Sequence, residues 1–169
     1  MRINNFKLKD QQIKKGSPLS ITLLILSGEL IFLLPYVLAR IFRPTFLEVF
    51  NLNNLQLGSL FSVYGIIALL SYVYGGVISD KFQPKKLIAY SLFFTSFGGL
   101  VLASYPSYFV LQILYGYWGF STVFLFWGAM IKATRIWGGT DNQGQAFGFL
   151  DGGRAVSYTH LTLPTILLV

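Results

Sequence analysis

The chain has 169 residues, of which 54% are hydrophobic, 11% are charged and none is cysteine. Because soluble domains carry roughly 25% charged residues, a surface this apolar is expected to be covered by lipid. The lack of cysteine excludes a disulfide framework and a cysteine-ligated metal, and the single histidine, His160, excludes a histidine metal cluster. No metal or other cofactor is therefore expected.

Four apolar runs are long enough to cross a bilayer, which takes about 20 helical residues. They lie at residues 19–39, 57–79, 87–105 and 108–131. A fifth run starts near Gln145 and is then interrupted. Isolated glycines and Pro35 inside these runs are common features of membrane helices. The sequence therefore predicts an all-α membrane protein with four transmembrane helices and a truncated fifth.

The basic residues lie mainly on one side of these predicted spans. Those on that side are Arg2, Lys7, Lys9, Lys14, Lys15, Lys81, Lys85, Lys86, Lys132 and Arg135. Only Arg40 and Arg43 lie in the loops on the other side. The positive-inside rule therefore places the amino terminus in the cytoplasm. Residues 1–18 are expected to form a basic cytoplasmic leader at the membrane surface, and no nucleic-acid partner is expected.

The carboxyl-terminal stretch "AVSYTHLTLPTILLV" does not fit as a continuation of the helix that "GQAFGFLDGGR" begins. Read backwards into codons, residues 156–165 match one reading frame of the transposase-end adapter used in sequencing libraries. The alternative is a short, irregular, genuine carboxyl terminus. We therefore expect residues 156–169 to be a non-native tail, and the fold is predicted from residues 19–154.

The loop between the second and third spans, "GGVISDKFQPKKLI", contains an aspartate at a helix end followed by lysines. It resembles the signature of the major facilitator superfamily, Gly-x-Leu-x-Asp-Arg-x-Gly-Arg-Lys-x-x-Leu. The matching positions are Gly76, Ile78, Asp80, Lys81, Lys85 and Ile88. Gln83 and Pro84 replace the signature's second glycine and the arginine after it, so the turn there must be made differently. The alternative is a generic cytoplasmic loop.

The resemblance covers residues 19–154 and implies part of the family's amino-terminal helical bundle. In the family this loop is a conformational latch between the two halves, a role that falls here on Gly76, Asp80, Lys81 and Lys85. Gly76 would let another helix approach closely, and Asp80 would meet the positive end of a neighbouring helix. The lysines would contact anionic lipid at the cytoplasmic surface.

Two predicted spans have a polar face, whereas the third carries no charge and is expected to face lipid. On the first helix the shared face holds Thr22, Glu29, Tyr36 and Arg40. On the fourth helix, a second face is formed by residues spaced three or four positions apart: Gln112, Tyr115, Gly119, Thr122 and Phe126. The resemblance implies that helices one and four line a central cavity. The candidate substrate or coupling residues there are Glu29, Tyr36, Gln112, Tyr115 and Thr122.

Glu29 and Arg154 each lie about ten residues from the predicted cytoplasmic start of their helix. At about 1.5 Å per residue, both should reach the bilayer centre, where an unpaired charge is costly. We therefore expect them to share one cavity as an ion pair, with Asp151 as an alternative partner for Arg154. The planar guanidinium of Arg154 would suit an anionic substrate group.

No arrangement typical of an enzyme is found. Gln112 stands where many drug/proton antiporters of the family carry an arginine, four residues before a glycine, which here is Gly116. Since that proton-linked signature is absent, the resemblance argues against a drug antiporter and favours a secondary transporter of small polar or anionic solutes. A proton or another ion would be the coupling partner. The chain would be a fragment, inactive alone, in a bacterial inner membrane. The alternative is a four-span structural or assembly protein, which would explain neither residues 76–80 nor Glu29.

Overall fold

The structure, a computed structural model, describes residues 17–166 of the chain. Of the predicted leader, Arg2, Lys7, Lys9, Lys14 and Lys15 lie outside the described residues. Within them the regular secondary structure is entirely helical. Four stretches are long and apolar enough to cross a membrane: Pro18–Ile41, Asn54–Lys81, Pro84–Ala103 and Tyr108–Gly138. The predicted all-α membrane fold is confirmed.

The first span changes from α-helix to π-helix in its second half. It consists of α1 (Pro18–Phe32), the π-helical segment η1 (Leu33–Val37) and α2 (Leu38–Ile41). The hydroxyl of Ser17 accepts a hydrogen bond from the Ser20 amide and so caps the start of α1. Pro35 lies inside η1, and because proline has no N–H, a regular α-helix cannot continue through it unchanged. The short helix α3 (Arg43–Val49) then leads to the second span.

The second and third spans are single uninterrupted helices, α4 (Asn54–Lys81) and α5 (Pro84–Ala103). Asn53 and Gln56 cap the start of α4 reciprocally, each side chain accepting a hydrogen bond from the other residue's amide. The buried face of α5 consists of Leu87, Ser91, Thr95, Gly98 and Leu102. These residues recur every three or four positions, and most of the opposite face is exposed, as expected for a helix that faces lipid.

The fourth span consists of α6 (Tyr108–Phe120), the π-helical η2 (Ser121–Trp127) and α7 (Gly128–Gly138). It extends seven residues beyond the predicted end at residue 131. The expected loop there is helical because Thr134 and Trp137 are buried on one face of α7.

The last helix, α8 (Gln143–Ile166), runs through much of the stretch that was expected to interrupt it. That expectation is wrong for the fold. The stretch from residue 154 to residue 163 contains neither glycine nor proline, so nothing in it breaks a helix. The non-native origin of residues 156–169 stays a prediction.

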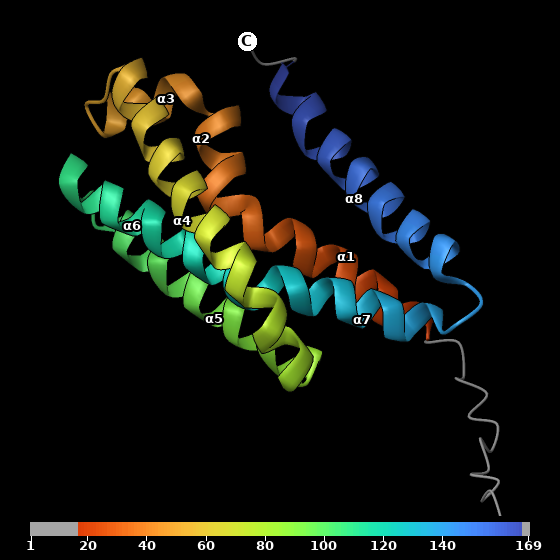
Figure 1. The fold of residues 1–169 in the computed structure, drawn as a ribbon. Helices are drawn as coiled ribbons and strands as arrows, with labels where there is room; N and C mark the ends of the chain where they lie inside the picture. The colour runs from red at the N-terminus through yellow and green to blue at the C-terminus, as the bar shows by residue number, and fades with distance from the viewer. Residues whose placement is uncertain (1–16, 167–169) are drawn as a thin grey trace, which may run out of the picture.

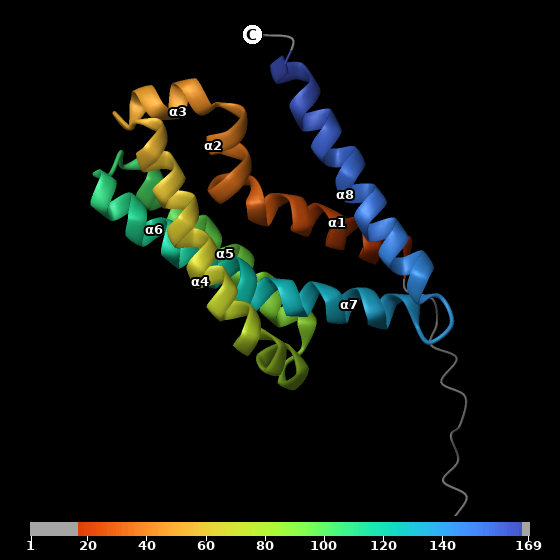
Figure 2. The same ribbon diagram turned by 45° about the horizontal axis from the view of Figure 1, so that its top comes forward.

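Figure 1 shows α4, α5 and α6 side by side, with α7 continuing the line of α6 towards the start of α1. Helix α8 packs against α1 and α7, and its carboxyl-terminal end stands apart from α2 and α3 in both views (Figure 1, Figure 2). The indole Nε1 of Trp137 donates to the Ser17 carbonyl at 3.0 Å, which joins the end of α7 to the start of α1. At the opposite end, the rings of Phe50 and Tyr105 lie 6.0 Å apart.

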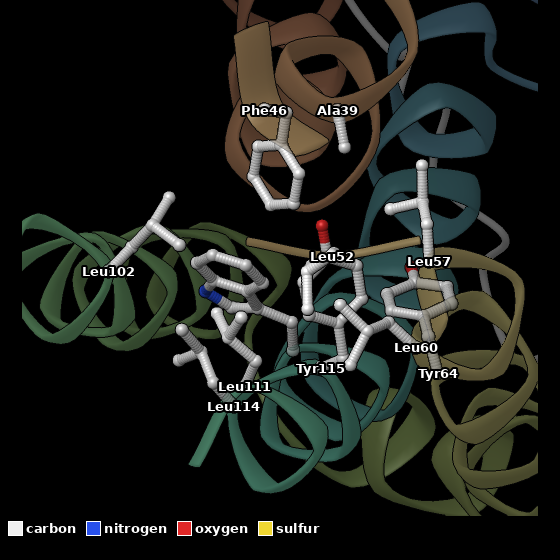
Figure 3. Close-up of a cluster of buried hydrophobic side chains, with 11 residues drawn as sticks. Ala39, Phe46, Leu52, Leu57, Leu60, Tyr64, Leu102, Leu111, Leu114 and Tyr115 are labelled. Carbon is white, nitrogen blue, oxygen red and sulfur yellow. The ribbon is translucent and has the colours of Figure 1, made fainter. Parts of the chain in front are cut away.

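Two apolar clusters fill the bundle. The cluster nearer α3 includes Phe46, Leu60, Leu111, Tyr115 and Trp118. Figure 3 shows Phe46 of α3, Leu60 of the second span and Tyr115 of the fourth span among the side chains that converge there. The second cluster, towards the other end, joins α1, α7 and α8 through Ile21, Leu24, Met130, Trp137 and Leu150. A polar cavity lies alongside these clusters.

Candidate functional site

The cavity has a volume of about 590 Å³ and lies between the first span, α4, η2 and α8. This size is typical of small-molecule sites, which span roughly 300–1,000 Å³. Its polar and charged lining residues are Glu29, Tyr36, Arg40, Tyr64, Asp151 and Arg154. Phe32 and Trp127 add aromatic walls. The cavity therefore offers both signs of charge beside apolar rings.

The structure joins Glu29 and Arg154 as an ion pair across this cavity. The Nε of Arg154 donates to the Oε1 of Glu29 at 3.2 Å, and the side chains are 24% and 14% exposed, respectively. The pair expected from their common depth is therefore present. Asp151 lines the same cavity, but among residues 17–166 it makes no ion pair with Arg154. Pairing offsets a cost of roughly 3 kcal/mol that insertion scales assign to a lone charge at mid-membrane.

Two aromatic rings and a glycine position the guanidinium of Arg154. Its Cζ lies 5.9 Å from the ring centroids of both Phe32 and Trp127, within the range of a cation–π contact. A Cβ added to Gly28 would lie 3.4 Å from the Cδ and Nε of Arg154, at van der Waals contact, so the arginine side chain passes close to the backbone of α1 at this glycine. Sequence reasoning missed these rings. The spacing of three residues between Glu29 and Phe32 was the available signal, and Trp127 gave none.

Glu29 occupies only one edge of the Arg154 guanidinium. The Nε is paired with Glu29, whereas the two terminal nitrogens have no hydrogen-bond partner among the side chains that the structure describes, those of residues 17–157, 159 and 160. A guanidinium carries five N–H donors in a planar fork that matches carboxylate and phosphate geometry. The free edge of Arg154 can therefore hold an oxyanion in two parallel hydrogen bonds while Glu29 stays in place.

The predicted polar face of the fourth helix does not line this cavity. Tyr36, which belongs to the predicted face of the first helix, does line it. Tyr115 is fully buried, with its ring packed against Phe61 and Trp118. Gln112 donates to the hydroxyl of Tyr108 at 3.1 Å. This face packs on α4 because Gly119 lets the two helices touch: a Cβ there would lie 2.6 Å from the Tyr64 carbonyl oxygen.

Thr122 does not line the cavity, but it contacts Tyr64, which does. Its Oγ1 lies 2.7 Å from the Tyr64 hydroxyl and also donates to the Trp118 carbonyl at 2.7 Å. Thr22, the outermost residue of the first polar face, is exposed and donates to the Pro18 carbonyl at 3.0 Å. Of the two predicted faces, the structure brings only Glu29, Tyr36 and Arg40 to the cavity.

The turn between α4 and α5 is made without the glycine of the family signature. Phe82 and Gln83 are both extended, with φ, ψ values of −108°, 161° and −71°, 127°. Pro84 then begins α5, where a missing N–H costs nothing and the fixed φ suits the first turn. Asp80, Lys81 and Lys85 are exposed around this turn.

The close helix contact expected at Gly76 is made one residue earlier. A Cβ added to Gly76 would meet no atom within 4 Å, whereas one added to Gly75 would lie 2.9 Å from the Phe124 carbonyl oxygen. Gly76 lies on an exposed face of α4, one helical step of about 100° from the face that touches η2. The carboxylate of Asp80 makes no hydrogen bond or ion pair with any residue between 17 and 166.

Lys132 contacts this same helix end, which sequence reasoning missed. Its Nζ donates to the backbone carbonyls of Ser79, Asp80 and Phe82 at 2.8, 2.9 and 3.2 Å. The residue was read as a loop charge because the fourth span was predicted to end at residue 131, immediately before Lys132, whereas the helix continues to Gly138. A groove of about 800 Å³ adjoins this contact, with Asp80, Lys132 and Arg135 in its lining.

Comparisons with known proteins agree with this architecture. The family model of the Major Facilitator Superfamily matches residues 6–159. Over 148 residues the chain is 29% identical to Inner membrane protein YqcE of Escherichia coli (strain K12), covering 88% of the chain and 35% of that protein. Over 135 residues it is 27% identical to Inner membrane protein YihN of the same organism, covering 80% and 32%.

A shorter match, 28% identical over 76 residues, is to an uncharacterized protein of Mycoplasma pneumoniae (strain ATCC 29342 / M129 / Subtype 1), covering 45% of the chain and 58% of that protein. The chain spans about a third of the length of the two Escherichia coli relatives. No solved structure matches it.

Proposed function

This chain belongs to the Major Facilitator Superfamily, and from that premise we propose that it is the amino-terminal part of a secondary transporter for small anionic solutes. The observation that carries the proposal is the free edge of the Arg154 guanidinium inside the cavity. Arg154 would bind a carboxylate or phosphate group of the solute, and Glu29 would hold Arg154 in position through its Nε.

The remaining lining residues would recognise the body of the solute. Phe32 and Trp127, whose ring centroids lie 6.4 Å apart, offer adjoining apolar surfaces beside the guanidinium. The side chains of Tyr36 and Tyr64 also line the cavity, and their rings lie 5.2 Å apart. A small organic anion with an apolar or hydroxylated body fits this combination better than an inorganic ion. Gln112, Tyr115 and Thr122 would act through packing.

Coupling to a proton or another ion would pass through Glu29. While Glu29 is ionised, its negative charge lies close to the free edge of Arg154 and repels an incoming anion. Binding of a proton to Glu29 would remove this repulsion while the side chain stays beside the Nε of Arg154, so the proton and the anion would favour each other's binding.

Transport by alternating access would need a second set of helices beyond this chain. Family members place the solute site at mid-membrane between two six-helix halves. Gly76, Asp80, Lys81 and Lys85 would form the latch towards that second half, and their exposure leaves them accessible to it. We place the protein in a bacterial inner membrane with its amino terminus in the cytoplasm, as the names of the relatives and the distribution of lysines suggest.

Ligand binding can be tested on the chain in detergent by thermal unfolding with matched pairs of compounds, such as a small carboxylate and its neutral amide. We expect the carboxylates to raise the melting temperature of the wild-type chain. The melting temperature of Arg154→Gln should not change when they are added. Arg135→Gln is the control, because Arg135 is exposed outside the cavity. Equal shifts from the neutral amides, or retained shifts in Arg154→Gln, would contradict the anion site.

Transport is tested in proteoliposomes. The longer parent protein is expected to accumulate the anion that stabilises the chain, and the 169-residue chain is expected to move none. Uptake by the chain alone at rates typical of carriers would overturn the proposal that it is a fragment.

A further inference from the structure

The ammonium group of Lys132 is fully occupied by the end of another helix. Lys132 belongs to α7, and its Nζ donates to the carbonyl oxygens of Ser79, Asp80 and Phe82 at 2.8, 2.9 and 3.2 Å. An ammonium has three N–H donors, so these three acceptors use all of them. The contact joins residues 50 to 53 positions apart in the sequence.

The carbonyls at the end of α4 need such a partner. The last four carbonyls of a helix have no intrahelical donor, and many helices satisfy them with a glycine in the left-handed conformation. Here Phe82 and Gln83 are extended, and no glycine follows α4. Lys132 therefore supplies from a neighbouring helix the donors that the turn itself lacks.

Small residues bring the two helices close enough for this contact. A Cβ added to Gly128, one turn before Lys132, would lie 2.7 Å from the Oγ of Ser79. A Cβ added to Gly75 would lie 2.9 Å from the carbonyl oxygen of Phe124 in η2. Because the backbones approach this closely, the side chain of Lys132 reaches the last turn of α4.

The position of Asp80 indicates that the contact between Lys132 and the end of α4 also has an electrostatic role. A carboxylate near the carboxyl-terminal end of a helix lies at the negative end of the helix dipole, which is unfavourable, whereas a cation there is favourable. Asp80 lies in the last turn of α4, and its carboxylate has no partner among residues 17–166. Lys132 provides the compensating positive charge without binding that carboxylate.

We propose that Lys132 is a positioning residue that fastens the cytoplasmic end of α4 to α7 and allows Asp80 to keep a free carboxylate there. The clamp lies within one bundle of helices, so it does not depend on the proposed solute or on a second half. It replaces, by a tertiary contact, the glycine turn of the family signature.

The test measures hydrogen exchange at the end of α4 in the purified chain. In Lys132→Met, exchange of the Lys81 and Phe82 amides is expected to rise roughly tenfold, within the range for a cation at a partly buried helix end. Lys132→Arg keeps a cation and several donors, so it should restore most of the protection. Lys81→Met is the control, because Lys81 is exposed on the same turn. Amides in α6 should not change in any variant.

A second measurement separates the electrostatic role from simple packing. In the Lys132→Met background, adding Asp80→Asn should slow exchange at Phe82, whereas Asp80→Asn in the wild type should change it less. Equal exchange in Lys132→Met and Lys81→Met would overturn the proposal, as would a uniform rise that includes α6. If Lys132→Met does not insert, Lys132→Gln replaces it. Equal protection in Lys132→Gln and Lys132→Arg would then show that no cation is required.

Discussion

Arg154 on α8 reaches across the cavity to Glu29 on α1, 125 positions earlier in the sequence, with 3.2 Å between Nε and Oε1. This contact links the first and last described helices at mid-span. Charge reversal tests it: Glu29→Arg and Arg154→Glu should each lower the melting temperature of the chain. The double variant should recover much of the loss, with a coupling free energy of roughly 1–3 kcal/mol. A double variant no better than the singles would show that the two side chains do not depend on each other.

Adjacent glycines in α4 are expected to respond differently to the same change. Gly75→Ala should lower the free energy of unfolding by roughly 1–3 kcal/mol, because the added Cβ would lie 2.9 Å from the Phe124 carbonyl oxygen. Gly76→Ala meets no atom within 4 Å, so it should be neutral or slightly stabilising in this chain. The measurement is unfolding by heat in matched detergent. Equal effects at both positions would contradict the contact between α4 and η2.

The hydrogen bond between Tyr64 and Thr122 gives a third prediction. Thr122→Val keeps the shape of the side chain but leaves the buried Tyr64 hydroxyl without its partner, at a cost of about 1–3 kcal/mol. Adding Tyr64→Phe removes the orphaned group, so the double variant should be more stable than Thr122→Val alone. Stability is measured by thermal unfolding. If the double variant is the least stable of the set, the hydroxyl of Tyr64 has another partner.

A fourth prediction concerns Asp80 in the longer parent protein. If the exposed carboxylate serves as part of a latch, Asp80→Asn should lower turnover roughly tenfold, the effect of about 1.4 kcal/mol, while insertion stays normal. Initial rates in proteoliposomes, normalised to the amount of folded protein, give the comparison. Normal rates combined with poor insertion would instead assign Asp80 a structural role.

The sequence was sufficient where one-dimensional quantities decide the structure. The lengths of the apolar runs predicted the four spans, and the equal distances of Glu29 and Arg154 from the starts of their helices predicted that the two would pair. It was insufficient where tertiary packing decides. Polar and aromatic residues spaced three and four positions apart identified one face of the fourth helix, which contains Tyr115. Such spacing cannot show which neighbouring helix covers that face. Gly119 packs it against α4, away from the cavity.

The two errors at helix ends had different causes. Lys132 looked like a loop residue because charge suggested the end of the span, whereas its amine is satisfied by carbonyls some 50 positions away. The expected interruption of α8 relied on the unusual origin inferred for the tail. Backbone geometry depends on the residues themselves, and those between 154 and 163 are compatible with a helix.

The π-helical segment η2 also affects how this family member can vary in length. Each residue added to or removed from an α-helix rotates everything beyond it by about 100°, which would normally misdirect every later side chain. A π turn holds one residue more than an α turn, so loss of a residue there can be absorbed by reverting to α geometry. Single-residue deletions should therefore be tolerated within Ser121–Trp127 more readily than in α6, with both ends of the span keeping their orientation.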